Sequence, residues 1–208
     1  MAYASRTGTR RNLAELREAG WGLMVSTYGE WRDEGFPYAV DNGAWTAHTQ
    51  GVPWDEGRFL GLLAVMGDGA DFIAVPDIVE GGLNSLRLSE SWLPRLPGDA
   101  LKLVPVQDGM EPDDVAPLLA DPMVGLFVGG STEWKVTRLG DFARLCMDLS
   151  RWCHVGRVNS LKRIWLCATS GADSFDGSSA SRYAVTCRKL DAARRQTALD
   201  FFREDNKR

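Results

Sequence analysis

The chain has 208 residues, of which 44% are hydrophobic and 25% charged, as expected for one soluble globular domain over residues 1–208. The formal net charge of −4 gives no overall attraction to nucleic acid, so such binding requires a local basic patch. No apolar run approaches the roughly 20 residues of a membrane span, and residues 1–11 lack the apolar core of a secretory signal, which together predict a cytoplasmic protein without membrane contact.

Apolar segments alternate with segments of helical period along the first half of the chain. We predict strands over residues 21–26, 38–45 and 71–77, and helices over residues 11–19, 54–66 and 83–93. The second of these strands is interrupted by Asp-Asn-Gly, and the third ends at Pro-Asp. Residues 94–98 are predicted to form a loop.

The second half continues the alternation. We predict strands over residues 101–107, 124–128, 153–155 and 172–175, and helices over residues 111–119, 137–150, 161–167 and 183–203. Acidic residues in the first turn of the 111–119 segment suit the positive end of a helix dipole. Either Asn159 or Ser160 is expected to cap the helix that begins at residue 161.

Strand, turn and helix thus repeat about seven times, and the strands are continuously apolar rather than alternating. This pattern is typical of a parallel sheet that is buried on both faces. A compact (β/α)8 TIM-type barrel of the α/β class fits the pattern best, with an open doubly wound sheet as the alternative. No linker, low-complexity tract or internal repeat divides the chain.

The four cysteines are irregularly spaced and form neither a C-x-x-C pair nor a cluster with histidine. This spacing does not fit a structural zinc site, and in a reducing compartment it predicts core or half-buried thiols. We expect no bound metal and no cofactor. The cysteines are Cys146, Cys153, Cys167 and Cys187.

Polar or glycine residues stand where the predicted strands end. In a parallel barrel the carboxyl ends of all strands meet at one rim, so these residues should converge there. Three carboxylates, one amide and a bare Gly-Gly backbone predict a pocket for a flat, polar ligand. The residues are Asp41, Asp77, Gln107, Gly129, Gly130, Gly156 and Asp176.

Each carboxylate also has a purely structural interpretation. Asp41 precedes Asn-Gly, a strong turn dipeptide, and can serve as a turn former. Asp77 follows a proline and can cap the next helix. Asp176 can accept hydrogen bonds from the amides of Ser178 or Ser179 as a cap.

The remaining rim residues and the histidines also have structural interpretations. Gln107 can satisfy loop backbone groups, and Gly129 with Gly130 can simply let the chain turn. The two histidines, His48 and His154, have no triad or metal-ligand spacing, so we interpret them as structural.

The segment GADSFDGSSASR, residues 171–182, resembles the nucleophile segment of the tRNA-guanine transglycosylase superfamily, G-[IV]-D-[ML]-F-D-C-x-x-P-T-R. Other family motifs have counterparts here in the same order. VDNGAWTAH is similar to D-S-G-G-[FY]-Q, IAVPDIV to the strand whose terminal Asp reads guanine, and VPVQDG to V-Q-G. GLFVGGSTEWK resembles the G-G-[LF]-x-x-G-E loop, and HVGRVNSLKRI resembles V-G-x-P-x-x-[IL]. The resemblance spans roughly residues 39–182, most of the chain.

The resemblance implies roles for the three carboxylates. Asp176 would be the nucleophile that attacks C1′ of a nucleotide, displaces the base and holds the sugar covalently. Asp41 would be the general acid and base for the leaving and incoming bases. Asp77 would accept hydrogen bonds from N1–H and the exocyclic amine of a guanine-like base.

The resemblance also implies contacts to the rest of the base. Gln107 and the amide of Gly130, which follows Gly129, would contact its carbonyl edge. Trp45 or Phe127 would stack on the base, with a place in the core as the alternative for either ring.

The sequence departs from the family pattern at several positions. The zinc site that follows the nucleophile in the tRNA enzymes has no counterpart in this sequence, and Gly177 stands where the family has cysteine. Residues 180–182 are Ala-Ser-Arg instead of Pro-Thr-Arg, and Asn42 replaces the serine of D-S-G-G. A short form without the zinc subdomain resembles the DNA-modifying branch, which bacteriophages often encode and which would then act in the host cytoplasm.

Members of that branch exchange guanine in DNA for a 7-deazaguanine such as 7-cyano-7-deazaguanine (preQ0). The resemblance therefore implies a glycosyltransferase of the pentosyltransferase type, with DNA rather than tRNA and a free 7-deazaguanine base as its partners. The target base must be flipped out of a duplex or presented on a single strand. Because the family often forms homodimers, a homodimer is also allowed.

Basic residues near the predicted nucleophile in sequence are available for phosphate contacts. They are Arg157, Lys162, Arg163 and Arg182, followed by Arg188 and Lys189. The alternative for the last helix is a solvated face formed by Arg188, Lys189, Arg194 and Arg195.

Two other functions remain open from the sequence. In the first, water resolves the covalent sugar, and the protein is a DNA base-excising glycosylase. In the second, the protein is a non-catalytic barrel that binds a purine or nucleic acid, which the substitutions around Asp176 would permit.

Overall fold

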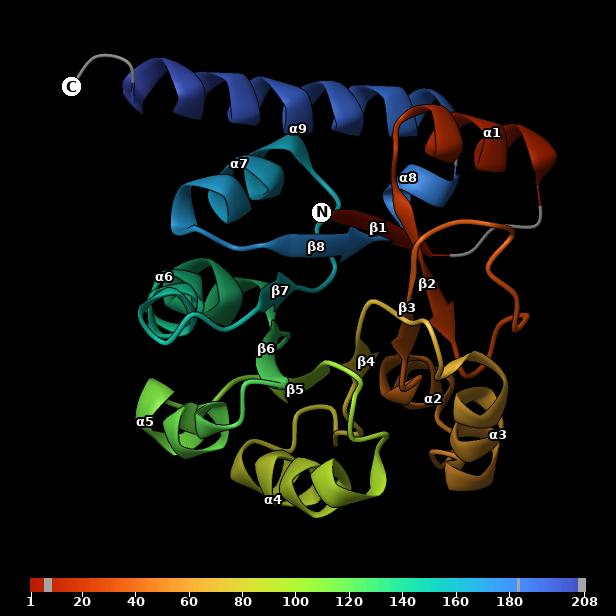
Figure 1. Ribbon diagram of the computed structural model, residues 1–208, viewed down its shortest axis with the longest axis vertical. Coiled ribbons are helices and arrows are strands. Elements are labelled where there is room, and N and C mark those ends of the chain that lie inside the picture. Colours follow the sequence, from red (N-terminus) through yellow and green to blue (C-terminus); the bar gives the residue numbers. More distant parts are fainter. Residues whose placement is uncertain (6–8, 183, 206–208) are drawn as a thin grey trace.

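The computed structural model describes residues 1–5, 9–182 and 184–205. Within these residues, eight parallel strands form a closed barrel in which each strand pairs with the next along the chain and the last pairs with the first (Figure 1). The strands are β1 (Ala2–Ser5), β2 (Gly22–Ser26), β3 (Tyr38–Asp41), β4 (Ile73–Ala74), β5 (Lys102–Val106), β6 (Val124–Val128), β7 (Cys153–Val155) and β8 (Ser174–Gly177). The predicted (β/α)8 TIM-type architecture is confirmed, and the open-sheet alternative is wrong.

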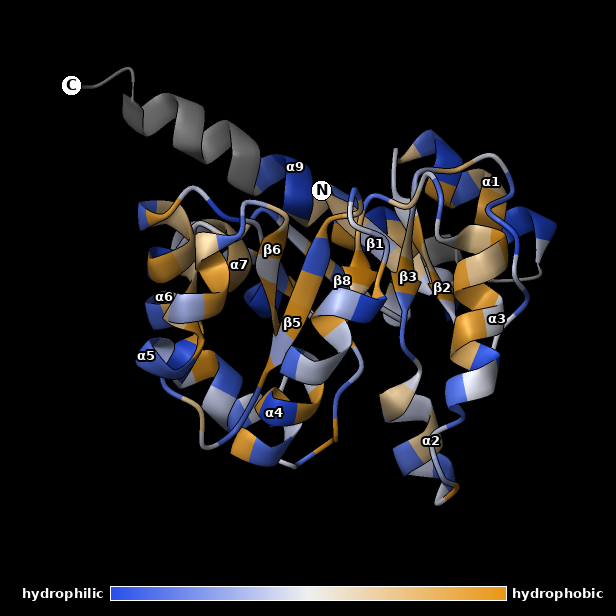
Figure 2. Ribbon diagram, turned by 60° about the horizontal axis from the view of Figure 1, so that its bottom comes forward, coloured by the Kyte–Doolittle hydropathy of each residue, from blue (hydrophilic) through white to orange (hydrophobic). Residues whose placement is uncertain are grey.

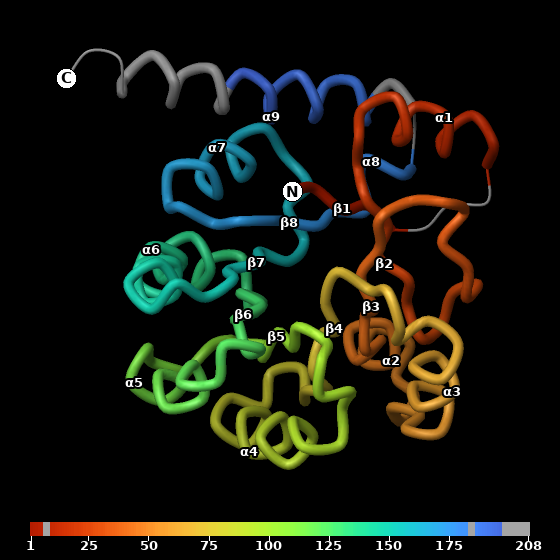
Figure 3. The backbone as a smooth tube through the Cα atoms, viewed as in Figure 1, coloured from red at the N-terminus to blue at the C-terminus, as the bar shows by residue number. Residues whose placement is uncertain are grey.

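Helices surround the barrel and cover the outer face of the strands. They are α1 (Arg10–Glu18), α2 (Ala44–Gln50), α3 (Glu56–Met66), α4 (Leu83–Trp92), α5 (Pro112–Val115), α6 (Thr132–Asp148), α7 (Leu161–Ser170), α8 (Ser179–Arg182) and α9 (Ala184–Asp205), with 3₁₀ turns η1 (Leu93–Arg95) and η2 (Ala116–Ala120). The long helix α9 lies along α1, α7 and α8 (Figure 3). In the described ranges, none of the helices has the length and apolar character needed to cross a membrane.

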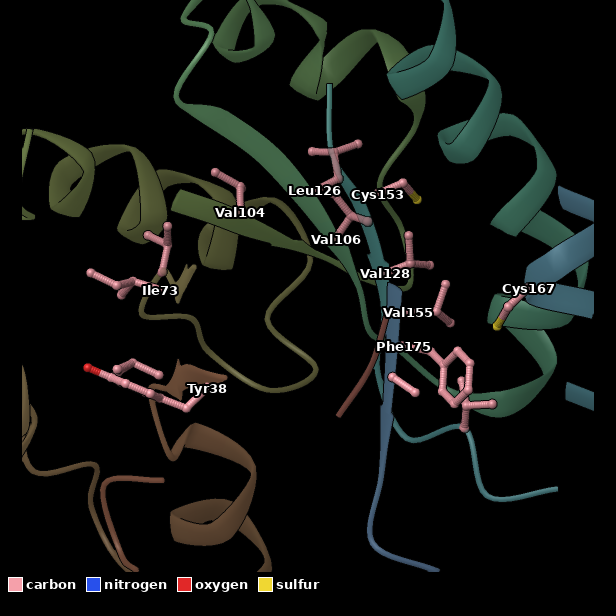
Figure 4. Packing of buried hydrophobic residues seen from close by; sticks show 14 of the residues in the cluster. Tyr38, Ile73, Val104, Val106, Leu126, Val128, Cys153, Val155, Cys167 and Phe175 are labelled. Carbon is pink, nitrogen blue, oxygen red and sulfur yellow. The ribbon is translucent and has the colours of Figure 1, made fainter. Parts of the chain in front are cut away.

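Alternation along the strands divides the buried side chains into two clusters. One face packs against the helices, as Val104, Val106 and Leu126 do in Figure 4. The other face fills the barrel interior with a cluster that includes Tyr3 and Phe72. Burial of each such large side chain stabilises the fold by about 2 kcal/mol. Because side chains of a strand alternate in direction, every second residue is aimed into the barrel.

The same alternation aims the carboxylates at the barrel axis. Asp41 lies two residues after Ala39, which belongs to the interior cluster, and it pairs in register with Ser26 of β2. Asp176 lies two residues after Ser174 and pairs with Tyr3, whose ring is part of the interior cluster. Both residues are therefore inward-facing and stand at or near the carboxyl ends of their strands.

The first strand is absent from the sequence-based prediction, which treated residues 1–11 only as a polar segment. β1 nevertheless pairs with β2 on one side and β8 on the other. Tyr3 lies opposite Gly22, where an added Cβ would come within 2.7 Å of the Tyr3 ring. The bare backbone of Gly22 thus makes room for the tyrosine inside the barrel.

The predicted strand over residues 38–45 is too long. β3 ends at Asp41 because Asn42 Oδ1 accepts a hydrogen bond from the amide of Ala44, at 2.7 Å, and Gly43 has a φ of 77°. The chain turns there, and α2 begins at Ala44, so residue 45 is helical rather than extended. Figure 2 shows α2 extending beyond the carboxyl end of β3.

Other boundaries differ by smaller amounts. Helix α6 begins at Thr132 instead of residue 137, because Ser131 Oγ caps it by accepting the amide of Trp134. Ser160 caps α7 in the same way. Strand β4 contains only two residues, and β8 begins at residue 174 rather than 172. Residues 93–95, predicted as the end of a helix and the start of a loop, form η1 instead. The predicted helix over residues 111–119 is divided into α5 and η2. The prediction for residue 183 lies outside the described residues.

Candidate active site

Three carboxylates from different strand ends meet at the carboxyl rim of the barrel. Asp41 ends β3, Asp77 follows β4, and Asp176 lies in β8. They are close enough to interact: the charge of Asp176 contributes to raising the pKa of Asp41, and that of Asp41 contributes to raising the pKa of Asp77. The structure thus brings together three of the residues that the sequence placed at the rim.

Asp77 is a desolvated carboxylate rather than a helix cap. Burial raises its pKa to about 6, against an opposing hydrogen bond from Asn42 Nδ2 to Oδ1 of 2.9 Å. The same amide group donates to the Val75 carbonyl at 2.7 Å, which fixes the Asn42 side chain. Helix α4 begins only at Leu83, after Gly82, so the capping interpretation of Asp77 is wrong.

Asp41 combines both of its predicted interpretations. Its Oδ1 accepts the amide of Gly43 at 3.3 Å, which is the turn interaction expected before Asn-Gly. Burial nevertheless raises its pKa, and the nearby charge of Asp176 acts in the same direction. A carboxyl group with a raised pKa releases its proton less readily than an ordinary aspartate, which suits a group that carries a proton.

Asp176 is contacted by groups from β7 and from the loop after it. Its Oδ1 lies 3.1 Å from His154 Nε2 and accepts the amide of Arg157 at 3.3 Å, while its side chain keeps 15% exposure. The Ser179 amide donates instead to Asn159 Oδ1, at 2.8 Å. Among the described residues Asp176 accepts no bond from Ser178 or Ser179, so its capping interpretation is wrong.

His154 is the residue of this site that sequence reasoning missed. It is fully buried inside the barrel, with the rings of Phe127, Phe72 and Tyr3 at centroid distances of 4.6, 4.9 and 5.9 Å. Burial lowers its pKa, while Asp176 acts to raise it. Its place in the site depends on the register between β7 and β8, which pairs residue 154 with Ser174, two residues before Asp176.

Gly156 leaves room beside Asp176. A Cβ at this position would lie 2.5 Å from Phe127 Cε1 and 3.4 Å from Asp176 Oδ1. Its carbonyl accepts a hydrogen bond from the buried ammonium of Lys135, whose pKa is lowered to about 8 by burial. A side chain at residue 156 would therefore displace the aromatic ring that packs on the site.

Gln107 and the glycine pair also lie at the rim. Gln107 is buried, and its Nε2 donates to the Ile78 carbonyl at 2.9 Å, as the structural interpretation predicted. Gly129 donates its amide to the Val106 carbonyl at 2.8 Å, which continues the ladder past β6. Gly130 has a φ of 70°, and an added Cβ there would meet Asp108 Oδ2 at 2.7 Å, so this turn requires glycine.

The two aromatic candidates lie in different environments. Trp45 on α2 is 45% exposed and stacks with the exposed His48, with centroids 5.8 Å apart. The guanidinium of Arg157 lies 4.1 Å from the Trp45 ring centroid and donates to the Gly130 carbonyl. Phe127 instead packs against the interior cluster, so its core alternative is the one observed, whereas Trp45 is a surface residue.

The basic residues after β7 divide into anchored and exposed groups. Arg157 is half-buried, and Arg163 donates to its carbonyl at 3.2 Å and to Thr132 Oγ1 at 3.3 Å. Lys162 and Arg182 are exposed. The first pair braces the loops of the rim, whereas the side chains of the second pair are open to solvent.

Cations of α9 are engaged by acidic side chains. Arg188 forms an ion pair with Glu15 of α1, and Arg194 and Arg195 contact Asp191 at 2.7 and 2.6 Å. These contacts favour the alternative in which this helix presents a charged, partly paired face rather than a phosphate-binding surface.

The four cysteines are buried free thiols, as predicted. Within residues 1–5, 9–182 and 184–205, no group of three or more histidine, cysteine, aspartate or glutamate side chains is arranged to hold a metal ion.

Comparison with protein-family models gave no match, and neither did comparison with curated proteins.

Proposed function

We propose that the protein is a transglycosylase that exchanges guanine in DNA for a 7-deazaguanine base through a covalent aspartyl–sugar intermediate. One observation carries the proposal: Asp176 and Asp41 interact at the rim of a parallel barrel but differ in their burial. Asp176 contacts His154 and the Arg157 amide and keeps 15% exposure, whereas Asp41, which accepts the Gly43 amide, is desolvated and has a raised pKa. Such a division is what a nucleophile and a proton carrier require.

In the first half-reaction, the Asp176 carboxylate attacks C1′ of the target nucleotide. The bond between C1′ and the base nitrogen breaks, its electron pair goes to the base, and Asp41 supplies the proton that the leaving base takes up. In the second, the incoming base returns a proton to Asp41 as its nitrogen attacks C1′. The ester bond breaks, and its electron pair returns to Asp176.

Recognition of the base would use the β3–β4 side of the rim. A carboxylate with a pKa of about 6 is mainly ionised at pH 7, so Asp77 can accept N1–H and the exocyclic amine of guanine or its deaza analogue. Asn42 holds this carboxylate in place. Gln107 Nε2 donates one of its two hydrogens to the Ile78 carbonyl. Its second hydrogen can therefore be donated to the carbonyl of the base.

The proposal that DNA is the substrate rests on the sequence resemblance. The exposed Lys162, in the first turn of α7, and Arg182, in α8, supply cations on the strand-end side of the barrel. Phosphate contacts of this kind fix the orientation of a nucleic acid without reading its sequence.

The proposal is tested by incubating the protein with DNA and 7-cyano-7-deazaguanine and analysing the digested nucleosides by mass spectrometry. We expect a deazaguanine nucleoside with the wild type and none with Asp176→Ala. Asp148→Ala, an exposed carboxylate at the end of α6, is the control and should retain exchange. Absence of the modified nucleoside from single- and double-stranded DNA alike would refute base exchange, and abasic sites formed without added base would indicate a glycosylase.

A further inference from the structure

A continuous chain of hydrogen bonds runs through the barrel interior to the candidate nucleophile. Trp152 Nε1 lies 2.8 Å from Ser174 Oγ, and Ser174 Oγ lies 2.8 Å from His154 Nδ1. His154 Nε2 lies 3.1 Å from Asp176 Oδ1. The chain passes between β7 and β8, where His154 and Ser174 are partners in register.

The chemistry of the end groups fixes the direction of every bond in this chain. An indole nitrogen only donates and an ionised carboxylate only accepts, so Ser174 accepts from Trp152 and the proton between His154 and Asp176 belongs to Nε2. In a neutral imidazole, Nδ1 must then be the acceptor, and the Ser174 hydroxyl donates to it. The opposite tautomer would direct the Nε2 lone pair at the carboxylate oxygen.

The surroundings of His154 favour a neutral imidazole. The side chain is fully buried among three aromatic rings, and burial is the largest influence on its pKa, which is lowered. Of the charged groups near it, Asp176 favours the protonated form, while the ammonium groups of Lys135 and of the amino terminus oppose it. A neutral donor can hold a carboxylate without cancelling its negative charge.

The two oxygens of Asp176 have unequal surroundings. Oδ1 faces His154 Nε2 and accepts the amide of Arg157, whereas Oδ2 accepts no hydrogen bond from the described residues. Gly156 presents only backbone beside Oδ1. The held oxygen thus sets the orientation of the carboxylate, and the other oxygen is left with its lone pairs available.

We propose that His154 is a positioning residue, fixed as the neutral Nε2–H tautomer by Ser174, and that it holds Oδ1 of Asp176 so that Oδ2 is the attacking atom. The statement about attack rests on the proposed function. The statement about the tautomer and the Asp176 contact does not, so the two are tested by separate measurements.

The tautomer is measured by nitrogen-15 NMR of protein labelled at histidine. The sequence contains two histidines, so the exposed His48 gives the one other imidazole spectrum and His154→Gln assigns the signals. We expect a neutral His154 with its proton on Nε2 at pH 7, and a shifted Nδ1 signal in Ser174→Ala because Nδ1 loses its donor. An Nδ1–H tautomer, or an imidazolium at this pH, would overturn the inference.

The positioning role is measured by the rate of base exchange in a graded set of variants. His154→Phe keeps an aromatic ring but removes the donor, and should lower kcat on the order of tenfold to a hundredfold with little change in KM for the free base. His154→Gln carries an N–H near the Nε2 position and should restore part of kcat. Trp152→Phe, which leaves Ser174 and His154 paired, should have the smallest effect.

The outcomes separate the inference from the proposed function. Unchanged kcat in His154→Phe, or equal losses in the Phe and Gln variants, would overturn the positioning role. If the wild type shows no exchange, the proposed function fails by itself. The carbon-13 shift of the Asp176 carboxylate then decides the inference: a change in His154→Phe with partial return in His154→Gln supports it, and no change overturns it.

Discussion

The two sides of the candidate active site differ in how far they bury the same kind of side chain. On the β3–β4 side, Asp41 and Asp77 are desolvated, and burial raises the pKa of each. On the β7–β8 side, Asp176 has donors from His154 and from the backbone of Arg157. Carboxylates that interact but differ in solvation can take on different chemistry, and here burial favours the protonated form of Asp41 and Asp77.

Replacing Asp41, the proposed proton carrier, should produce the largest effect. In Asp41→Asn the amide cannot transfer protons, so we expect base exchange to fall by roughly 10²- to 10⁴-fold. Circular dichroism should show an intact fold, because the amide replaces a carboxyl group whose ionised form is already disfavoured by burial. An exchange rate within a few-fold of the wild type would show that Asp41 carries no proton.

Asp77→Asn tests whether burial raises the pKa of Asp77, by a stability measurement that does not depend on base exchange. The pKa of Asp77 is raised from 3.8 to about 6, so its protonated form contributes stability below pH 4 that is lost as the pH rises through 6. This loss amounts to about 3 kcal/mol, and the variant does not undergo it. Between pH 4 and pH 7, urea denaturation should therefore show that the free energy of unfolding of the variant rises relative to that of the wild type. A constant difference over this range would contradict a raised pKa.

Gly156→Ala perturbs the opposite side by crowding. Its Cβ would lie 2.5 Å from Phe127 Cε1, and the displaced ring packs on His154. We expect a loss of roughly 2 kcal/mol in the free energy of unfolding, measured by chemical denaturation. Gly140→Ala is the matched control, because its Cβ meets nothing within 4 Å and lies in α6, where alanine should stabilise by up to about 1 kcal/mol. Equal effects of the two substitutions would argue against crowding at residue 156.

The smallest effect is expected outside the carboxylates. Lys162→Gln should weaken DNA binding by a few-fold and reduce the slope of log K against log salt by about 0.7 to 0.9, the value for one phosphate contact. Fluorescence anisotropy at several salt concentrations measures this slope. Arg144→Gln, an exposed cation toward the far end of α6, is the control. Equal slopes for the two variants would show that Lys162 does not contact a DNA phosphate.

The sequence predicts the barrel well because its strands are buried on both faces and therefore continuously apolar. β1 escapes prediction because Ala2–Ser5 contains only small residues and one tyrosine, and it is a strand only through pairing with both neighbours. The turn after Asp41 was correctly located, but hydrogen bonding by Asn42 begins a helix that apolar periodicity did not indicate.

The candidate site, too, was predicted only in part from the sequence. Strand-end position alone brought Asp41, Asp77 and Asp176 to one rim, since a parallel barrel gathers such residues whatever lies between them. His154 could not be recognised in this way. Its partners, Ser174 and Asp176, lie on the next strand, and their contact depends on the register between β7 and β8, which no local pattern contains.

The pairing of β1 with β8 bears on how the protein acquires its site during folding. β1 and β8 are separated along the chain by the other six strands, and one edge of β1 has no partner until β8 is in place. Closing so long a segment of chain costs entropy before the pairing can repay it, so this step should be slow. The strand that bears Asp176 thus completes the barrel, and the candidate site is assembled only when β8 has paired with β1.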